Sequence, residues 1–155
     1  MNYPDTLFDA FMYPLEAVSL TEKRRRLIPR ASGDVLEIGA GTGTNLAFYD
    51  PASIRSLTLT DLELTERATE RAHEFRLLAG LTNGEIDLRE ADALSLPFRD
   101  DEFDTVVITL VFCSVPDQAA GLAEIRRVLR PDGRLIFIEH VRPHGAVRHV
   151  VDRLN

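Results

Sequence analysis

The chain has 155 residues, of which 45% are hydrophobic and 28% charged, and 18 basic against 25 acidic side chains give a formal net charge of −7. This composition excludes a disordered or fibrous protein, and the length favours a single domain spanning 1–155. No apolar run approaches the ~18 residues of a membrane span, no secretory signal is visible, and the acidic balance argues against a nucleic-acid partner.

The first predicted element is a helix in the N-terminal region. Ser19-Leu20-Thr21-Glu22 is a capping-box sequence, which predicts a helix that begins there and continues to about Ile28. Within it, Lys23-Arg24-Arg25-Arg26 is the tightest basic cluster of the chain. Because no aromatic residue is interleaved with it, the cluster is more typical of a solvated helix face than of a nucleic-acid patch.

Five short runs rich in Val, Ile and Leu follow, and amphipathic segments separate them. We expect strands at 34–38, 55–60, 85–89, 105–110 and 134–140. Helices are predicted at 64–79, where Gly80 is a natural stop, and at 118–129, with Leu122 on the apolar face and Pro131 beyond the end. This alternation predicts an α/β fold with a Rossmann-like, doubly wound and mostly parallel sheet.

The first strand runs directly into glycines at every second position, in the sequence Gly39-Ala40-Gly41-Thr42-Gly43. Glycine allows a positive φ and close approach of the backbone to a ligand, and in an open α/β sheet this place is the usual ligand crevice. The spacing departs from the dinucleotide pattern G-x-G-x-x-G, because its sixth position here is Thr44. A nicotinamide-dependent oxidoreductase is therefore the less favoured alternative, and a glycine turn without any ligand also stays open.

S-adenosylmethionine (SAM) suits this loop better, because it has no phosphate but carries a carboxylate and an ammonium group. Backbone N–H groups of the loop, and of a helix that Asn45 begins, can take the carboxylate, and Glu37 can favour the cationic end. Asp61 lies 20 residues after Gly41, where an acidic side chain accepts hydrogen bonds from both ribose hydroxyls, and Leu62 can pack on the adenine face. The alternative role for Asp61 is to cap the following helix.

These motifs, together with Glu90–Phe98, Phe103–Val107 and Leu122–Val141, resemble the class I SAM-dependent methyltransferases. The resemblance covers about 33–141 and implies a cofactor-binding core there, with SAM as cofactor and S-adenosylhomocysteine as product. It also implies that Asp92 and Ala93, with the adjacent Ala91, read the adenine edge, and that Thr109 and Leu110 line the methionine end.

Within that class, 111–117, 137–141 and 45–49 are similar to the methyltransferase-like 7 group, whose members methylate small thiols, and less closely to the quinone-biosynthesis and phospholipid methyltransferases. The resemblance implies in-line methyl transfer to a small-molecule acceptor of the thiol, quinone or lipid-like kind. Amino-group methyltransferases are disfavoured, because Thr109-Leu110-Val111-Phe112 stands where they carry an Asn/Asp-Pro-Pro-aromatic turn. No residues have metal-ligand spacing, so no metal is expected. A non-catalytic SAM-binding domain is the alternative function.

No general base can be identified from the sequence. His140, Ser114 and Cys113 are weak catalytic candidates near the expected acceptor end, although Cys113 is more typical of a packed residue and His140 of a hydrogen-bonded strand end. Cys113 is the single cysteine, which indicates a reducing compartment and predicts a cytoplasmic protein.

The two ends of the chain frame the expected core. In the N-terminal part, 1–32, we expect a lid or substrate wall that contains the aromatic residues Tyr3, Phe8, Phe11 and Tyr13, with simple core packing as an equal alternative. Only 142–155 follow the last predicted strand, whereas related methyltransferases continue with a helix and an antiparallel strand pair. We therefore expect a core that lacks the family's last two strands, and either a truncated fragment or a homodimer that pairs through the exposed fifth-strand edge.

Overall fold

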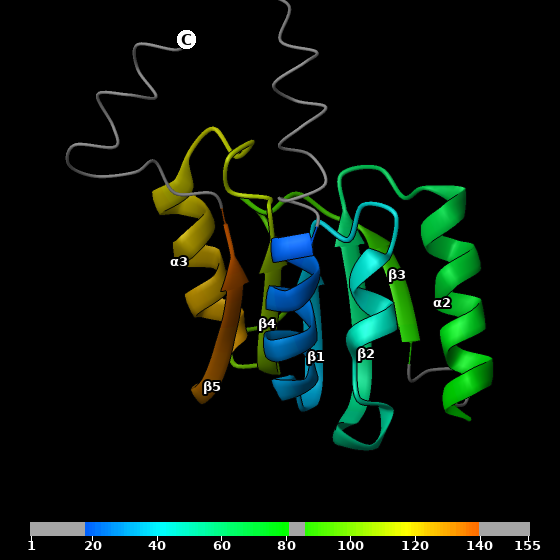
Figure 1. The fold of residues 1–155 in the computed structure, drawn as a ribbon. Coiled ribbons are helices and arrows are strands. Elements are labelled where there is room, and N and C mark those ends of the chain that lie inside the picture. Colours follow the sequence, from blue (N-terminus) through cyan, green and yellow to red (C-terminus); the bar gives the residue numbers. More distant parts are fainter. Residues whose placement is uncertain (1–17, 81–85, 140–155) are drawn as a thin grey trace, which may run out of the picture.

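Five parallel strands form one sheet in the computed structural model, which describes residues 18–80 and 86–139 (Figure 1). The strands are β1 Gly33–Ile38, β2 Ile54–Asp61, β3 Ile86–Glu90, β4 Phe103–Thr109 and β5 Leu129–Ile138, and their order across the sheet is β3-β2-β1-β4-β5. All pairings between them are parallel. The predicted α/β fold with a parallel sheet is therefore confirmed.

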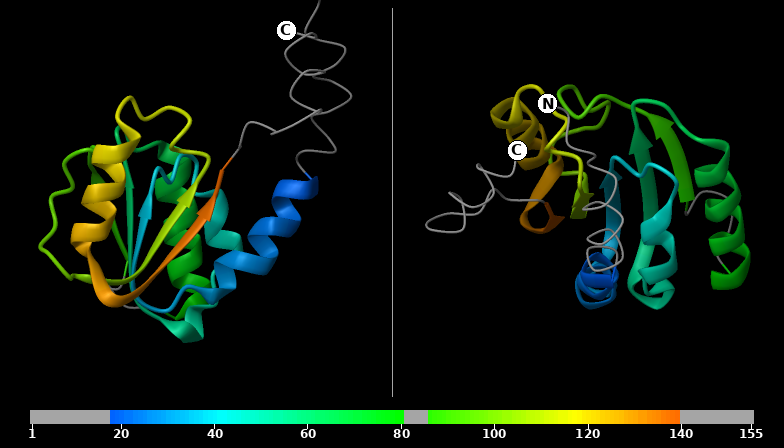
Figure 2. Two further views of the ribbon diagram at one scale, coloured as in Figure 1. Left: turned by 90° about the vertical axis from the view of Figure 1, so that its left-hand side faces the viewer. Right: turned by 45° about the horizontal axis from the view of Figure 1, so that its top comes forward.

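Helices cover both faces of the sheet, because its strands are apolar on both sides. Val35 and Leu36 are neighbours in β1 and both are fully buried, but they belong to the cores on opposite faces. Helix 18–27, the 3-10 helices η1 Ile28–Arg30 and η2 Thr44–Phe48, and α2 Glu66–Ala79 pack on the Val35 face; α3 Gln118–Val128 packs on the Leu36 face (Figure 2). A third 3-10 helix, η3 Pro51–Ser53, leads into β2. Within the described ranges, no helix is both long and apolar enough to span a bilayer.

Local capping sets most helix boundaries. Thr65 accepts the Ala68 N–H at the start of α2, and Gly80 ends that helix in the left-handed conformation, as predicted. The capping-box prediction for the first helix is wrong, because residues 18 and 19 are already helical. Glu22, which would have to reach back to Ser19, forms an ion pair with Arg25 instead.

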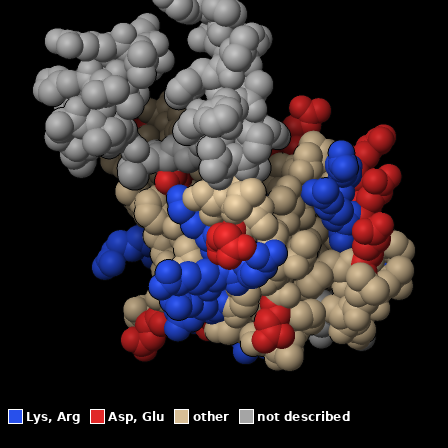
Figure 3. Space-filling view, viewed as in Figure 1, with Lys and Arg blue, Asp and Glu red and all other residues tan. Residues whose placement is uncertain are grey.

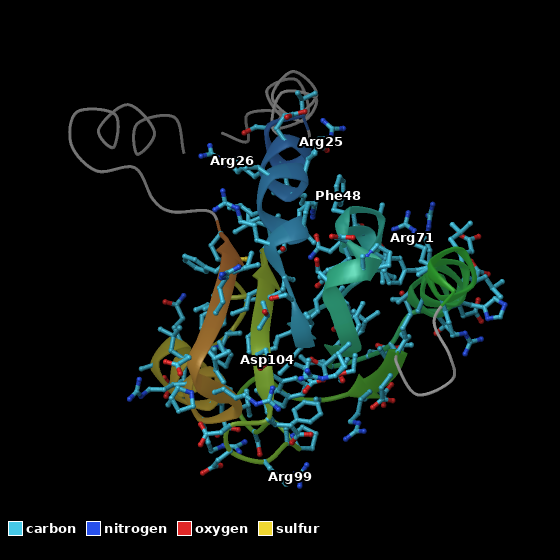
Figure 4. The ribbon with its side chains drawn as sticks, turned by 90° about the horizontal axis from the view of Figure 1, so that it is seen from below. Arg25, Arg26, Phe48, Arg71, Arg99 and Asp104 are labelled. Carbon is cyan, nitrogen blue, oxygen red and sulfur yellow. The ribbon has the colours of Figure 1, made fainter. Side chains whose placement is uncertain are left out.

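A four-residue ion-pair network ties together the amino ends of the strands. Arg55 and Arg130 each contact the carboxylates of both Asp34 and Asp104, and Figure 4 shows Asp104 at this end. Hydrogen bonding from Arg55 lowers the pKa of Asp34 to about 2. The network fixes the end of the sheet that lies opposite the strands' carboxyl ends.

The basic cluster of helix 18–27 is mostly solvated, as predicted. Lys23, Arg25 and Arg26 are exposed, and Figure 3 shows basic side chains gathered over this helix. Arg24 differs from them, because it is half-buried.

An apolar strip accompanies β5 on its α3 side. Leu122, Leu135 and Phe137 are 49%, 38% and 52% exposed, although the helical pattern placed Leu122 in the core. Leu122 is exposed because, in the described part of the chain, no element covers this side of α3. The sheet as described ends at β5, so pairing of a second copy along that edge stays a prediction.

Candidate functional site

A cavity of about 400 Å³ opens at the carboxyl ends of β1, β2 and β4, where the strand order reverses on either side of β1. Ligand pockets of proteins span roughly 300–1,000 Å³, so the size suits a small molecule. Thirteen of the fourteen residues predicted to bind the cofactor line this cavity: Glu37, Gly39, Ala40, Gly41, Thr42, Asn45, Asp61, Leu62, Ala91, Asp92, Ala93, Thr109 and Leu110. The fourteenth, Gly43, does not line it and instead is the N-cap residue that precedes η2, with a φ of 71°.

Several lining residues were missed by the sequence reasoning. They are Arg24, Ile38, Thr44, Leu94, Val111, Val115 and Pro116. Most of them are neighbours of predicted residues in the chain, and this adjacency is the sequence signal that points to them. Arg24 has no such signal, because it lies far from the glycine loop in the sequence.

The glycine loop is folded by hydrogen bonds of its own backbone. The Gly39 and Ala40 N–H groups both donate to the Thr60 carbonyl, and the Gly43 N–H donates to the Ala40 carbonyl. The Gly41 N–H donates to the Asp61 carboxylate over 2.7 Å. These amide donors are therefore already used within the protein. The helix expected at Asn45 is only the five-residue 3-10 helix η2, which is too short to act as an anion-binding terminus.

Arg71 of α2 fixes the outer side of the loop. Its guanidinium donates to the Thr42 carbonyl over 2.9 Å and lies 3.3 Å from the hydroxyls of Thr42 and Thr44 (Figure 4). Helical periodicity alone leaves Arg71 on the outward side of the predicted helix 64–79. The contact depends on how α2 packs beside the loop, which the helical periodicity does not specify.

Replacing Gly39 by alanine is expected to destabilise the loop by about 1–3 kcal/mol and to weaken ligand binding. Gly39 has a φ of 71°, and a Cβ there would lie 2.3 Å from Val111 Cγ2, so the β4 loop has to move. Urea unfolding and calorimetric titration with S-adenosylhomocysteine measure the two effects. Gly41→Ala is the matched control, because Gly41 also has a positive φ but a Cβ there meets no atom within 4 Å.

Asp61 lies at the end of β2 and lines the main cavity. One oxygen accepts the Gly41 N–H and the other the Leu62 N–H at 2.8 Å, which leaves lone pairs on both for further donors. The alternative role as a helix cap is wrong, since Thr65 caps α2. Leu62 beside it is 73% exposed, as expected of an apolar side chain placed to cover a ligand's flat face.

A buried polar cluster forms the floor of the cavity. Glu37 is 1% exposed, and its two carboxylate oxygens accept hydrogen bonds from Asn45 Nδ2 at 3.0 Å and Tyr49 Oη at 2.7 Å. Asn45 Nδ2 also lies 3.0 Å from Thr109 Oγ1, and its Oδ1 accepts from Arg24 Nε at 2.9 Å. The cluster joins the first helix, β1, η2 and β4 through one amide.

Burial governs the acidity of this cluster. Removal from water raises the pKa of Glu37 to about 7, against the lowering by the hydrogen bonds from Tyr49 and Asn45. Burial also raises the pKa of Tyr49 well above its usual value, and it lowers the pKa of Arg24. Glu37 therefore changes charge near neutral pH, while Arg24 stays a cation.

The remaining predicted positions lie on the two sides of the cavity. Asp92 is exposed and accepts the Leu94 N–H through Oδ1 at 2.9 Å, which forms a turn after β3. On the other side, Thr109 ends β4 and Leu110 follows with a φ of 57°, an unusual conformation for a residue with a Cβ. Strained backbone of this kind is common where a loop forms a binding wall.

The acceptor-side candidates separate in the structure. Ser114 lines the main cavity, whereas Cys113 lines a second, apolar cavity of about 330 Å³ with Leu122 and Phe137. The interpretation of Cys113 as a packed residue is wrong, because its side chain is exposed. His140 and the candidate lid residues Tyr3, Phe8, Phe11 and Tyr13 lie outside the described residues. Over 18–80 and 86–139, no group of three acidic, histidine or cysteine side chains is arranged to hold a metal ion.

A family model described as "Methyltransferase domain" matches residues 36–137, so the chain belongs to this family of class I SAM-dependent methyltransferases. The nicotinamide-dependent alternative is thereby excluded. The family match includes all or part of every strand of the sheet, and all residues of the main cavity except Arg24.

Several individual methyltransferases are similar to this chain. Human thiol S-methyltransferase TMT1B is 36% identical over 152 residues, which cover 88% of this chain and 58% of that protein. The mitochondrial methyltransferase OMS1 of Saccharomyces cerevisiae is 31% identical, covering 81% and 29%, and the quinone C-methyltransferase UbiE of Geotalea daltonii is 29% identical, covering 72% and 47%. The crystal structure of YcgJ from Bacillus subtilis superposes with a TM-score of 0.65 at 29% identity, covering 90% of this chain and 58% of YcgJ. The chain thus spans between about a third and three-fifths of these proteins.

Proposed function

We propose that this chain binds SAM in the main cavity and transfers its methyl group to a small, largely apolar acceptor, a thiol in the first place. The observation that carries the proposal is the placement of two carboxylates, Asp61 and Glu37, on one cavity with the exposed Leu62 between the strand ends. A ribose diol, an ammonium group and a flat purine complement these three features.

The residues of the acceptor side favour a thiol. In the described residues, the loop that follows β4 contributes Leu110, Val111, Ser114, Val115 and Pro116 to the cavity, and none of these is a base. A thiol with a pKa of about 8.5 reaches its nucleophilic thiolate form without help, whereas phenols and amines depend more on a general base. The name of the human relative, a thiol S-methyltransferase, supports the same class of acceptor.

For methyl transfer from SAM, the main task of the protein is to position the acceptor. When bound, SAM supplies a methyl group already activated on a sulfonium. The strained turn at Leu110, whose N–H donates to the Ile138 carbonyl at 2.8 Å, fixes the acceptor wall against β5. Glu139 adds to this by accepting the N–H groups of Val111 and Phe112 at 2.7 and 2.9 Å. A fixed wall can hold the nucleophile roughly 3–3.5 Å from the methyl carbon, in line with the leaving sulfur.

The test is transfer of a labelled methyl group from SAM to a panel of matched thiols, phenols, quinols and amines, followed by mass spectrometry. The expected result is an S-methylated product, formed with one S-adenosylhomocysteine per turnover and at a rate that rises with pH up to the pKa of the thiol. Transfer to quinols or amines alone would contradict the thiol assignment. Tight S-adenosylhomocysteine binding without transfer to any acceptor would instead support a non-catalytic SAM-binding domain.

We place the activity in the cytoplasm, because a single cysteine is typical of a reducing compartment.

A further inference from the structure

Arg24 is a cation with unused hydrogen-bond donors at the edge of the main cavity. It belongs to helix 18–27, is half-buried, and lines the cavity with Glu37 and Asn45. Its Nε donates to Asn45 Oδ1, and among the described residues no carboxylate lies within ion-pair distance and no acceptor meets its two terminal nitrogens. Arg25 and Arg26, by contrast, lie toward the outer part of the same helix (Figure 4).

Anchoring the first helix does not require this arrangement. Leu20, Leu27 and Ile28 already pack the helix and η1 on the apolar core. A guanidinium carries five N–H donors. When it is partly buried and most of these donors lack an acceptor in the protein, a ligand or solvent normally accepts their hydrogen bonds. Burial lowers the pKa of Arg24, and the charge of the nearby Glu37 offsets this only in part.

The Asn45 amide separates a cation from an anion across the cavity floor. Its oxygen accepts from Arg24 and its nitrogen donates to Glu37, so the two charged groups lie on either side of it. Arg24 donates to Asn45 and not to Glu37, whose two oxygens each accept one hydrogen bond, from Asn45 and from Tyr49, and keep a lone pair for a further donor. A cation and a carboxylate presented side by side complement the carboxylate and ammonium of an α-amino acid.

The glycine loop cannot serve this carboxylate through the amides of Gly39, Ala40, Gly41 and Gly43, since these donors are used within the protein. We infer that Arg24 binds the carboxylate of the cofactor's amino-acid moiety, with Asn45 holding the guanidinium in place. This inference rests on the proposed function, because it assumes SAM as the ligand of this cavity. It assigns a cofactor-binding role to a helix that lies outside the matched family region.

The inference is tested by calorimetric titration with two ligands that differ in one group, S-adenosylhomocysteine and its decarboxylated analogue, which keeps the amine. The wild-type chain is expected to bind the first about 30-fold more tightly, a difference of ~2 kcal/mol that is typical of a charge-assisted pair. Arg24→Met, which keeps the apolar stem, is expected to lose that difference and to leave binding of the analogue within about threefold. Arg24→Lys should restore part of it.

Arg26→Met is the matched control, because Arg26 is an exposed cation on the same helix. It should leave both affinities unchanged, which separates a contact of Arg24 from a general loss of positive charge. If Arg24→Met weakens the binding of both ligands equally, the inference is wrong and Arg24 has a structural role. The inference is also wrong if the wild-type chain binds the two ligands with equal affinity. A wild-type chain that binds neither ligand would overturn the proposed function together with it.

Discussion

Replacing Glu37 by glutamine is expected to stabilise the ligand-free protein above neutral pH. Glu37 is 1% exposed and its pKa rises from 4.5 to about 7 on folding. Because the folded pKa is the higher one, the favourable contribution of this carboxyl is fully present below about pH 4.5 and is lost as pH rises through 7. The difference between these two pKa values corresponds to about 3 kcal/mol of stability at pH 8. Glutamine stays neutral throughout and keeps an oxygen for Asn45.

Urea unfolding of both proteins at pH 5, 6.5 and 8 measures this effect. The free energies of unfolding should agree most closely at pH 5 and separate in favour of the variant toward pH 8. Glu124→Gln is the control of opposite sign, because hydrogen bonding from Arg127 lowers the pKa of Glu124. That variant should lose stability at pH 8. Parallel pH curves for wild type and Glu37→Gln would show that Glu37 does not titrate near neutrality.

The same substitution is expected to weaken S-adenosylhomocysteine binding by at least about tenfold at pH 8, or ~1.4 kcal/mol. The ligand's ammonium group favours an ionised Glu37, so wild-type affinity should fall about tenfold from pH 8 to pH 6 as the carboxyl takes up its proton. The affinity of Glu37→Gln should stay flat over that range. Gain of stability with loss of binding is typical of a residue kept for function rather than for folding.

Replacing Asp61 by alanine is expected to weaken cofactor binding by about 100-fold, or ~3 kcal/mol, the worth of two charge-assisted hydrogen bonds to a ribose diol. The fold should lose only about 1 kcal/mol, since the hydrogen bonds lost in the protein are those from the partly exposed Gly41 and Leu62 amides. Asp61→Asn keeps one acceptor oxygen, so its affinity for the cofactor should lie between those of the wild type and Asp61→Ala. Calorimetry with S-adenosylhomocysteine and a thermal melt measure both quantities.

The ribose assignment is isolated by repeating the titration with a 2′,3′-dideoxy analogue of S-adenosylhomocysteine. Asp61→Ala should bind this analogue nearly as well as the wild type does, because the analogue lacks the hydroxyls in question. Glu63→Ala is the matched control, an exposed carboxylate two residues further along the same loop. If Asp61→Ala binds S-adenosylhomocysteine as tightly as the wild type does, the assignment of Asp61 to the ribose hydroxyls is wrong.

The elements with strong local signals were predicted well. The β1, β2 and β4 runs are rich in Val, Ile and Leu, and Gly80 ends α2 through backbone chemistry that neighbouring residues alone decide. The prediction for Ser19 failed because a capping box specifies which groups can bond and not whether the helix starts there. Leu122 failed for a related reason, since periodicity defines an apolar helix face without saying whether another element covers it.

The sequence by itself determined the class of this protein and most of its cavity. The glycines after β1 and the acidic residue after β2 lie at strand ends, and parallel strands bring those ends to one edge of the sheet whatever the details of packing. Only the tertiary structure decided which of four consecutive basic residues faces the cavity, and that Asn45 holds Arg24 and Glu37 apart. Both depend on how the first helix is seated on the sheet, and that seating is set by contacts between residues distant in the chain.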